Sequence, residues 1–463
     1  MEKYDLIVIG GGPGGYEAAL EASKVYGMKT ALVEARDLGG TCLNRGCIPT
    51  KTWLHTADML SEVRNQGETI GLKGFSSLDF DMAAVKARKD QVVTQLVGGI
   101  ASLMKSGKIK VYNGTGSITA PGKVTVCASD GTKDEIEGTN VLIATGSVPA
   151  VPPIPGADSP KVVTSDELLD LDHPVEHLII IGGGVIGCEF ASIFSSLGAQ
   201  VTILEALPGL IANLDKELGR SLSMIFKKSR GIDIHTGAMV TGIEEADGKI
   251  SCLFTEKDKE SSVTGDLVLM SVGRKPNTKG LFPEGALEGA LKGLSLERGR
   301  IIVNERYETG VPGIYAIGDV IGGIQLAHVA TAEGRNAVAF MNGAEAAADL
   351  RAVPSCIYTS PEIASVGITA DEAKEQGLDV VTKKYPMSAN GKTVLSLQER
   401  GFIKVTADKE SGKVLGAQLM CARATDMISQ FSQAIVNGLT LKDMAQVIYP
   451  HPTFNEGIGE AVR

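Results

Sequence analysis

Two cysteines near the N-terminus lie five positions apart, and residues of this type at this spacing can carry redox or metal chemistry. Cys42 and Cys47 stand in a glycine-containing stretch, and Lys51 follows the second cysteine by four residues. A purely structural disulfide is a weak explanation, because closing so short a loop restricts the unfolded chain by only about 2 kcal/mol. Without signs of secretion, such a pair is more often catalytic or metal-binding. We therefore predict a reactive dithiol in this stretch.

The other five cysteines are isolated in the sequence, and we interpret them as ordinary buried or half-buried thiols. They are Cys127, Cys188, Cys252, Cys356 and Cys421. No cysteine or histidine cluster has the spacing of zinc ligands, so the sequence predicts no metal site.

A histidine and a glutamate near the C-terminus form a second group of candidate catalytic residues. His451 lies in a proline-rich run, and Glu456 follows it by five residues. Thiol oxidation needs a base that titrates near neutrality, which histidine provides, and a carboxylate could orient the imidazole and raise its basicity. A histidine in a proline-rich loop is often merely exposed, and the two residues alone leave that alternative open.

The elements that must position these groups begin with a strand, a glycine turn and a helix. Residues 6–9 form a β-branched apolar run, and Gly10, Gly12 and Gly15 follow it in the GxGxxG pattern. This pattern lets the backbone approach a pyrophosphate at a helix N-terminus. A second strand ends in Glu34, where an acid can bond the ribose hydroxyls of an adenosine. These features predict a dinucleotide site directly before the dithiol.

The same pattern returns after a proline-rich connection. Residues 177–181 form an apolar strand, Gly182, Gly184 and Gly187 follow it, and the next strand ends in Glu205. A carboxylate at that position bonds free ribose hydroxyls and repels the extra phosphate of NADP, so it favours NAD. The segment is apolar enough to pass for a membrane span, but its glycines divide it into strand, turn and helix. A second dinucleotide site is therefore predicted.

Length and composition predict a large globular protein. The 463 residues suffice for about three domains, and 43% of them are hydrophobic, which is ample for sizeable cores. The net charge of −10 comes from scattered residues, without the basic stripe that nucleic-acid binding requires. The N-terminus lacks the basic region, apolar core and cleavage site of a signal peptide. We expect a cytoplasmic protein that binds neither nucleic acid nor a membrane.

The dithiol stretch and the two glycine patterns resemble the pyridine nucleotide-disulfide oxidoreductases. The run from Leu43 to Lys51 is most similar to the dihydrolipoyl dehydrogenase group of that family, and the resemblance covers essentially the whole chain. It implies an α/β fold with two Rossmann-like dinucleotide-binding domains and a C-terminal α+β dimerisation domain. The FAD-binding domain would be discontinuous, with the NAD-binding domain inserted. The implied ranges are 1–147 for the FAD-binding domain, 148–275 for the NAD-binding domain, 276–346 for the central segment completing the FAD domain and 347–463 for the interface domain.

The implied activity is oxidation of protein-bound dihydrolipoamide, with electrons passing through FAD to NAD⁺. Cys42 and Cys47 would form the redox-active disulfide, with Cys47 nearer the flavin and Cys42 exchanging with the substrate. His451, contributed across a homodimer, would deprotonate the substrate thiol, and Glu456 would orient the imidazole. The lipoyl group would belong to a lipoyl domain or a lipoyl carrier protein of a multienzyme complex.

The resemblance also implies which residues hold the two cofactors, FAD and NAD. Lys51 would lie against the flavin, Glu189 near the nicotinamide and Asp319 at the ribityl hydroxyls, although Lys51 and Glu189 could also be ordinary helical residues. The cofactor-binding candidates are Gly10, Gly12, Gly14, Gly15, Glu34, Thr41, Lys51, Gly114, Gly116, Thr145, Gly146, Gly182, Gly184, Gly187, Glu189, Glu205, Val240, Gly273, Arg274, Gly318, Asp319 and Ala327. Among them, Gly114 and Gly116 resemble a turn that touches the cofactor, and ordinary hairpin glycines are the alternative.

Two other functions fit parts of the pattern. A glutathione reductase-like reductase of low-molecular-weight disulfides would share the cysteines and the histidine, but Glu205 disfavours it because those enzymes typically select NADPH. A flavoprotein assembly subunit would leave its disulfide idle, which the joint presence of Cys42, Cys47, His451 and Glu456 argues against.

Overall fold

The structure is a computed structural model that describes residues 2–398 and 401–463, and it divides the chain into two compact units. The first unit contains the residues up to Thr50, Ala87–Ala150 and Gly273–Leu350. The second unit contains Lys51–Lys86, Val151–Val272 and Arg351–Arg463. Each unit is built from three separate stretches of chain, and the four domain ranges expected from the sequence stay a prediction.

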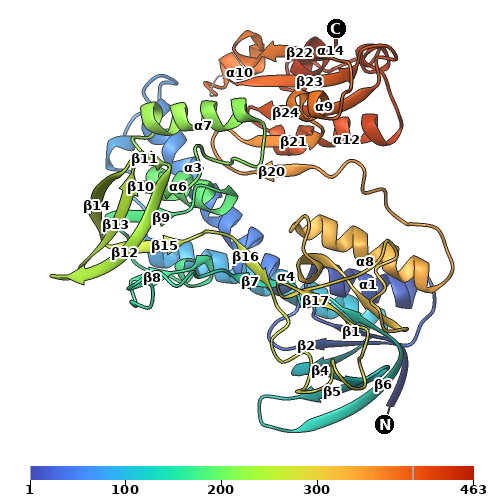
Figure 1. Cartoon of the computed structure of the whole chain (residues 1–463). Coiled ribbons are helices and arrows are strands. Elements are labelled where there is room, and N and C mark those ends of the chain that lie inside the picture. Colours follow the sequence, from blue (N-terminus) through green and yellow to red (C-terminus); the bar gives the residue numbers. More distant parts are fainter. Residues whose placement is uncertain (1, 399–400) are drawn as a thin grey trace. The chain divides into compact units, whose positions relative to one another are not determined.

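A seven-stranded sheet forms the centre of the first unit, in the order β3-β2-β1-β6-β5-β4, with β19 also paired to β6 (Figure 1). Its strands are β1 (Glu2–Ile9), β2 (Thr30–Glu34), β3 (Lys110–Asn113), β4 (Thr115–Ala120), β5 (Lys123–Cys127), β6 (Lys133–Ile143) and β19 (Ile314–Ala316). The strands β1, β2, β3, β6 and β19 run parallel. Because β19 returns to this sheet from a distant part of the chain, the predicted discontinuous α/β fold is confirmed.

Alternate side chains of β1 face two different layers. Leu6 and Val8 pack with residues of the helices, whereas Ile7 and Ile9 pack with residues of β4 and β5. The helices of this unit are α1 (Pro13–Lys24), α2 (Gly40–Arg45) and α8 (Ala327–Met341), together with the C-terminal part of α4 (Met82–Ser106). A strand covered on both faces must be apolar throughout, which explains the unbroken apolar run at residues 6–9.

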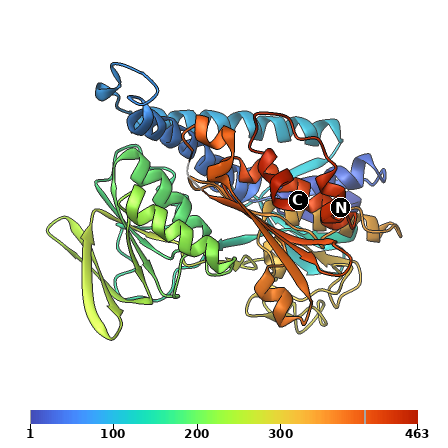
Figure 2. The same cartoon turned by 90° about the horizontal axis from the view of Figure 1, so that it is seen from above.

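The second unit repeats this arrangement. Its parallel sheet has the order β11-β10-β9-β15-β8, and a separate antiparallel sheet has the order β12-β13-β14. The strands are β8 (Val162–Val163), β9 (His177–Ile181), β10 (Gln200–Glu205), β11 (Asp233–Thr236), β12 (Ala238–Ala246), β13 (Lys249–Glu256), β14 (Lys259–Gly265) and β15 (Leu267–Met270). Leu178 and Ile180 pack with α6 (Val185–Leu197) and α7 (Lys216–Ser229), which lie side by side in Figure 2, and Ile179 and Ile181 pack with β12 and β13.

The C-terminal part of the second unit is a five-stranded antiparallel sheet with helices. The strand order is β20-β21-β24-β23-β22. Its elements are β20 (Ser355–Ile357), β21 (Ile363–Gly367), α9 (Ala370–Glu375), β22 (Val380–Pro386), α10 (Gly391–Leu395), β23 (Phe402–Asp408), β24 (Val414–Met420), α11 (Ala424–Met427), α12 (Ser429–Val436), α13 (Leu441–Ala445) and α14 (Glu456–Val462). Alternate residues of β23, such as Ile403 and Val405, are buried with α12 and α14 in one core. This is the expected α+β region.

Short elements complete the fold. They are α5 (Ser165–Leu168), the paired strands β7 (Ser147–Pro149) and β16 (Arg274–Pro276), the paired strands β17 (Leu296–Glu297) and β18 (Arg300–Ile301), and the 3-10 helices η1 (Phe75–Ser77), η2 (Gly318–Ile321) and η3 (Met387–Ala389). The long helix α3 (Cys47–Gln66) begins at the second cysteine of the dithiol stretch.

The structure adds one element to the dithiol stretch and corrects one expectation. The dithiol stretch contains a short helix, α2, before α3 begins at Cys47. Gly116 lies inside strand β4 rather than in a turn, so only Gly114 occupies the connection from β3 to β4.

The apolar segment around Gly182 is a strand, a turn and a helix, as predicted. Among the described residues, no helix combines the length and the apolar character needed to cross a bilayer. The five isolated cysteines are buried or half-buried, which confirms their interpretation. Within residues 2–398 and 401–463, no three His, Cys, Asp or Glu side chains gather as ligands of a metal ion would.

Candidate functional site

The first glycine turn has no room for side chains at two of its positions. Gly10 has a φ of +108°, and a methyl group on it would lie 2.3 Å from the carbonyl oxygen of Ala144. A methyl group on Gly15 would lie 1.9 Å from the carbonyl oxygen of Gly10. Gly12 is the N-cap of α1 and has open space around it, with its nearest neighbour 3.9 Å away. The turn therefore presents bare backbone at a helix N-terminus, which is how an anionic phosphate group is bound.

The second glycine turn has the same geometry. Gly182 has a φ of +109°, and a methyl group on it would lie 2.5 Å from the carbonyl oxygen of Ser271. A methyl group on Gly187 would lie 2.0 Å from the carbonyl oxygen of Gly182, whereas Gly184, the N-cap of α6, has nothing within 4 Å. The internal repeat seen in the sequence is thus a repeat of two glycine turns with the same backbone geometry.

The acids at the ends of β2 and β10 each accept hydrogen bonds from backbone N–H groups, one of which belongs to the neighbouring glycine turn. Glu34 accepts hydrogen bonds from the N–H groups of Gly11 at 2.6 Å and Arg36 at 2.7 Å. Glu205 accepts from the N–H of Gly183, and from the N–H of Leu207 at 2.6 Å. A carboxylate has about four acceptor positions, so each acid keeps capacity for ribose hydroxyls beside the turn.

The dithiol stretch packs directly on the first glycine turn. The N–H of Gly39 donates to the carbonyl oxygen of Gly11 at 2.8 Å, and a methyl group on Gly40 would lie 2.6 Å from the Cα of Gly12. Cys42 lies on α2, which begins at this contact, and is half-buried. Cys47 is exposed and is the first residue of α3, where the helix dipole favours a thiolate. The fold therefore brings the dithiol stretch next to the first glycine turn.

Lys51 and Glu189, predicted separately, lie together in the second unit. The Nζ of Lys51 donates to the carboxylate of Glu189 at 2.6 Å, and the residue Glu189 is only 4% exposed. The N–H of Tyr358 donates to the other carboxylate oxygen at 3.0 Å, and the Lys51 ammonium lies 4.6 Å from the centre of the Tyr358 ring. A buried glutamate needs such partners to remain charged. Sequence reasoning missed Tyr358, which no motif marks.

Asp319 lies at the start of η2 in the first unit, and Ser147 donates a hydrogen bond to its carboxylate. Arg274 donates to Ser147 through Nε and NH2, at 2.7 Å to the hydroxyl and 2.8 Å to the carbonyl oxygen. Glu333 on α8 accepts from the N–H of Gly318 at 2.7 Å. Sequence reasoning named Asp319, Gly318 and Arg274 but missed Ser147 and Glu333, because only the fold brings them together.

His451 and Glu456 form the expected pair in the second unit. The Nδ1 of His451 lies 2.9 Å from one carboxylate oxygen of Glu456, and the other oxygen accepts from the N–H of Thr453 at 2.9 Å. The Thr453 N–H and His451 hold the pKa of Glu456 below its ordinary value. The imidazole is 78% exposed, so its Nε2 is available for proton transfer.

The remaining candidates occupy varied positions. Val240 is buried among the core residues behind β12, so only its backbone could meet a ligand. A methyl group on Gly14 would lie 2.8 Å from the carbonyl oxygen of Ala330, so Gly14 is needed for packing of α1 on α8. Thr145 donates to the carbonyl oxygen of Asn277 at 2.7 Å and Ala327 is the first residue of α8. Gly146 and Gly273 have positive φ, Gly114 follows β3, and Thr41 lies on α2.

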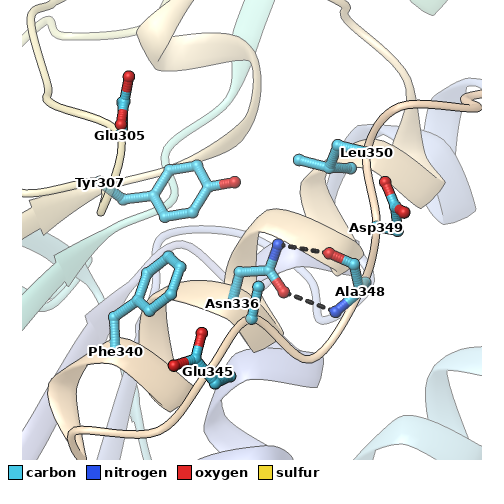
Figure 3. A pocket seen from close by; sticks show the side chains of 9 residues that line it. Glu305, Tyr307, Asn336, Phe340, Glu345, Ala348, Asp349 and Leu350 are labelled. Carbon is cyan, nitrogen blue, oxygen red and sulfur yellow. Dashed lines mark hydrogen bonds between the residues drawn. The ribbon is translucent and has the colours of Figure 1, made fainter.

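A pocket of about 460 Å³ lies elsewhere in the first unit, around the C-terminal end of α8 (Figure 3). Its walls include Tyr307, Phe340 and Asn336, and two hydrogen bonds join Asn336 to the backbone of Ala348. None of the residues that line it is a predicted site residue. This pocket is therefore not part of the predicted site.

Comparison with known proteins gives a consistent result over the whole chain. The family model for pyridine nucleotide-disulphide oxidoreductases matches residues 4–334, and the model for the dimerisation domain of these enzymes matches residues 353–462. A dihydrolipoyl dehydrogenase of Bacillus subtilis is 40% identical, with 99% of this chain and 97% of the relative covered. Mitochondrial dihydrolipoyl dehydrogenase 1 of Arabidopsis thaliana is 37% identical, with 99% and 90% covered.

Two solved structures have the same fold over the whole chain. LpdA from Mycobacterium tuberculosis superposes with a TM-score of 0.90 at 28% identity, covering 100% of this chain and 99% of that chain. The HOCl-induced flavoprotein disulfide reductase RclA from Escherichia coli, as its Cu(II) complex, gives a TM-score of 0.88 at 30% identity, with the same coverage.

Proposed function

Because the chain belongs to the pyridine nucleotide-disulphide oxidoreductase family, we propose that it is a dihydrolipoyl dehydrogenase that oxidises protein-bound dihydrolipoamide and reduces NAD⁺. Its cofactors are FAD and NAD. The observation that carries the proposal is the contact of Gly40 with Gly12, because it joins the stretch with the dithiol to a phosphate-binding turn. A disulfide that exchanges electrons with a flavin needs this proximity.

The residues of the first unit fit FAD. The bare backbone at Gly12 and the N-terminus of α1 would bind the pyrophosphate, Glu34 would bind the ribose, and Asp319 would bind the ribityl chain. The second unit offers the matching turn at Gly184, with Glu205, for NAD. Bound FAD supplies the two-electron acceptor that connects a dithiol to NAD⁺.

The two cysteines would carry the thiol exchange. His451 takes the proton from one substrate thiol, and the resulting thiolate attacks Cys42, so that a substrate–Cys42 disulfide forms and the Cys42–Cys47 bond breaks. The electron pair of the broken bond remains on Cys47 as a thiolate, which the N-terminus of α3 stabilises. The second substrate thiol then attacks the substrate sulfur of the mixed disulfide and closes the lipoamide ring, while the Cys42–substrate bond breaks and the proton of that thiol passes to the departing Cys42 sulfur, which is released as a thiol.

His451 can serve as the base because Glu456 holds it at Nδ1 and leaves Nε2 exposed. Glu456 is itself fixed by the N–H of Thr453. We place this pair across the interface of a homodimer, from the partner subunit, and the match of residues 353–462 to a dimerisation domain supports that arrangement. A cytoplasmic location and a lipoyl domain or carrier protein as substrate complete the proposal.

A steady-state assay distinguishes this proposal from its rivals. Lipoamide and glutathione disulfide are each offered with NADH and with NADPH, in the reverse direction. We expect lipoamide reduction with NADH to have the highest kcat/KM. Preferential turnover of glutathione disulfide with NADPH would instead make the protein a low-molecular-weight disulfide reductase, and reduction of the flavin without turnover of either disulfide would indicate an idle disulfide.

A further inference from the structure

We propose that Ser147, Arg274 and Glu333 are positioning residues for FAD, with Ser147 and Arg274 orienting the side chain of Asp319 and Glu333 holding the backbone before it, and that Arg274 acts at the flavin cofactor rather than at NAD. The inference rests on the proposed role of Asp319 in FAD binding. Its basis is a set of hydrogen bonds within the first unit that link β7, β16, η2 and α8.

The side chain of Asp319 is held by a two-step contact. Ser147 is 6% exposed, and its hydroxyl donates to the Asp319 carboxylate. That hydroxyl accepts from the Nε of Arg274 at 2.7 Å, while NH2 of the same guanidinium donates to the Ser147 carbonyl oxygen at 2.8 Å. The guanidinium of Arg274 thus donates hydrogen bonds to both oxygens of Ser147. This orients the hydroxyl hydrogen of Ser147 toward Asp319.

The arginine lies on β16, which pairs with β7 of the serine. Arg274 is opposite Pro149 and Pro276 is opposite Ser147 in this short antiparallel pair. Both strands belong to the first unit, as does Asp319. Lysine could not replace the arginine, because an ammonium lacks the two parallel N–H groups of the guanidinium fork.

The backbone of Asp319 is held by α8. Gly318 has a φ of +71°, and a methyl group on it would lie 3.1 Å from the Cβ of Ala330. One turn further along α8, the Glu333 carboxyl accepts from the N–H of Gly318 at 2.7 Å. Glu333 therefore fixes the residue that sets the direction of Asp319. Burial raises the pKa of Glu333 to about 7; the Gly318 N–H opposes the rise and the charge of Asp319 adds to it.

The carboxyl groups of Asp319 and Glu333 are neighbours, and each accepts a hydrogen bond from a different donor. Two neighbouring carboxylates repel each other unless donors hold them, and here each has its own donor, Ser147 for Asp319 and the Gly318 N–H for Glu333. The arrangement fixes Asp319 before FAD binds. Binding of the ribityl hydroxyls therefore costs little side-chain conformational entropy.

The test measures FAD retention and NADH use separately in the holoenzyme. The variants are Arg274→Lys, Arg274→Ala, Glu333→Ala and Glu333→Gln, with Arg298→Ala as control because Arg298 is an exposed arginine of the same unit. The readouts are the rate of FAD release in dilute guanidinium, the FAD Kd of the reconstituted apoprotein, and the KM for NADH. A circular dichroism spectrum confirms that each variant is folded.

We expect both Arg274 variants and Glu333→Ala to weaken FAD binding about tenfold, the effect of one lost charge-assisted hydrogen bond. Glu333→Gln should bind FAD as tightly as the unaltered protein, because its amide oxygen can still accept from the N–H of Gly318. The KM for NADH and the control should not change. A raised KM for NADH with unchanged FAD release in the Arg274 variants would overturn the inference and return Arg274 to the NAD site.

Failure of the inference can be told apart from failure of the proposed function. Asp319→Asn is measured in parallel. If it weakens FAD binding while the Arg274 and Glu333 variants do not, the three residues are not positioning residues although the FAD site stands. If Asp319→Asn also binds FAD normally, the FAD site itself has been placed wrongly.

Discussion

The carboxylate of Glu205 stabilises the second glycine turn, because it accepts hydrogen bonds from the N–H groups of Gly183 and Leu207. The residue is 9% exposed. A basic substitution would remove the negative charge but would also leave two N–H groups without their acceptor, so it would confound cofactor choice with folding. Glu205→Gln removes the charge and keeps one acceptor oxygen, so it leaves one of the two N–H groups, rather than both, without its acceptor.

We expect Glu205→Gln to narrow the preference for NADH over NADPH about tenfold, because a neutral amide no longer repels the 2′-phosphate. Glu205→Arg should narrow it as well, with a loss of stability. The measurement is the ratio of kcat/KM values for the two cofactors. Equal use of NADH and NADPH by the unaltered protein would remove the basis of this prediction.

The two cysteines differ in position, so their substitutions should differ in effect. Cys47 starts α3, whose N-terminus stabilises a thiolate, whereas Cys42 lies on α2. Cys42→Ser should abolish lipoamide turnover but keep a long-wavelength thiolate-to-flavin charge-transfer band. Cys47→Ser should abolish both. Visible spectra of the two variants decide the matter, and a band that survives only in Cys47→Ser would exchange the two roles.

Glu333 gives a stability term with a definite sign. Its pKa is raised from an ordinary value of 4.5 to about 7, so the folded protein binds more protons than the unfolded chain between these values. Stability should therefore be lost as the pH rises from about 4.5 to about 7. After allowance for partial exposure, the loss is about 2 kcal/mol.

Glu333→Gln removes this titration, so it should gain stability relative to the unaltered protein as the pH increases. Urea unfolding of both proteins at pH 5 and pH 8 measures the difference. Besides burial, the charge of Asp319 contributes to the raised pKa of Glu333. Burial raises the pKa of Tyr307, and the charge of Glu333 adds to that rise. A stability difference that stays constant between the two pH values would show that Glu333 does not titrate in this range.

At the scale of elements, each glycine turn contains glycines that are needed for close packing and glycines whose backbone is open to a ligand. A methyl group on Gly187 would lie 2.0 Å from a carbonyl oxygen of the same turn, but Gly184 has open space. Gly187→Ala should destabilise the protein by about 3 kcal/mol or more, because the helix α6 must move away from its strand. Gly184→Ala should fold normally and raise the KM for NADH. Thermal unfolding and NADH kinetics separate the two effects, and equal loss of stability would contradict the assignment.

The strands and helices of both repeats could be predicted because local chemistry determines them. The apolar run at residues 6–9 and the glycines after it have one sterically allowed arrangement, and the same holds around Gly182. The short helix α2 could not be predicted, since it depends on contact of Gly40 with Gly12.

The individual residues of the candidate site were easier to predict than their partners. Glu34, Asp319, Lys51 and Glu189 each stand in a recognisable motif. Their partners, such as Ser147 and Tyr358, come from other elements and have ordinary neighbours in the sequence. A single sequence contains the motif but not the pairing, because the pairing is a property of the folded chain.

At the scale of the whole molecule, one strongly exposed apolar side chain marks the C-terminal region. Ile448 is 94% exposed in the single chain, and Val447 beside it is 53% exposed. They come shortly before His451 and lie within the region matched by the dimerisation model. Apolar side chains this exposed indicate an interaction surface, because burying them against another subunit releases water.

We therefore expect Ile448→Asp to dissociate the homodimer and to abolish lipoamide turnover, since His451 would no longer be presented to the cysteines of the other subunit. Light scattering should give a molar mass near 48.4 kDa for the variant and twice that value for the unaltered protein. Val25→Asp is the matched control, because Val25 is 62% exposed in the first unit and should tolerate the same change. FAD should remain bound in both variants. An Ile448→Asp protein that stays dimeric would show that this surface lies outside the interface, and a monomer with full lipoamide turnover would show that His451 acts within its own subunit.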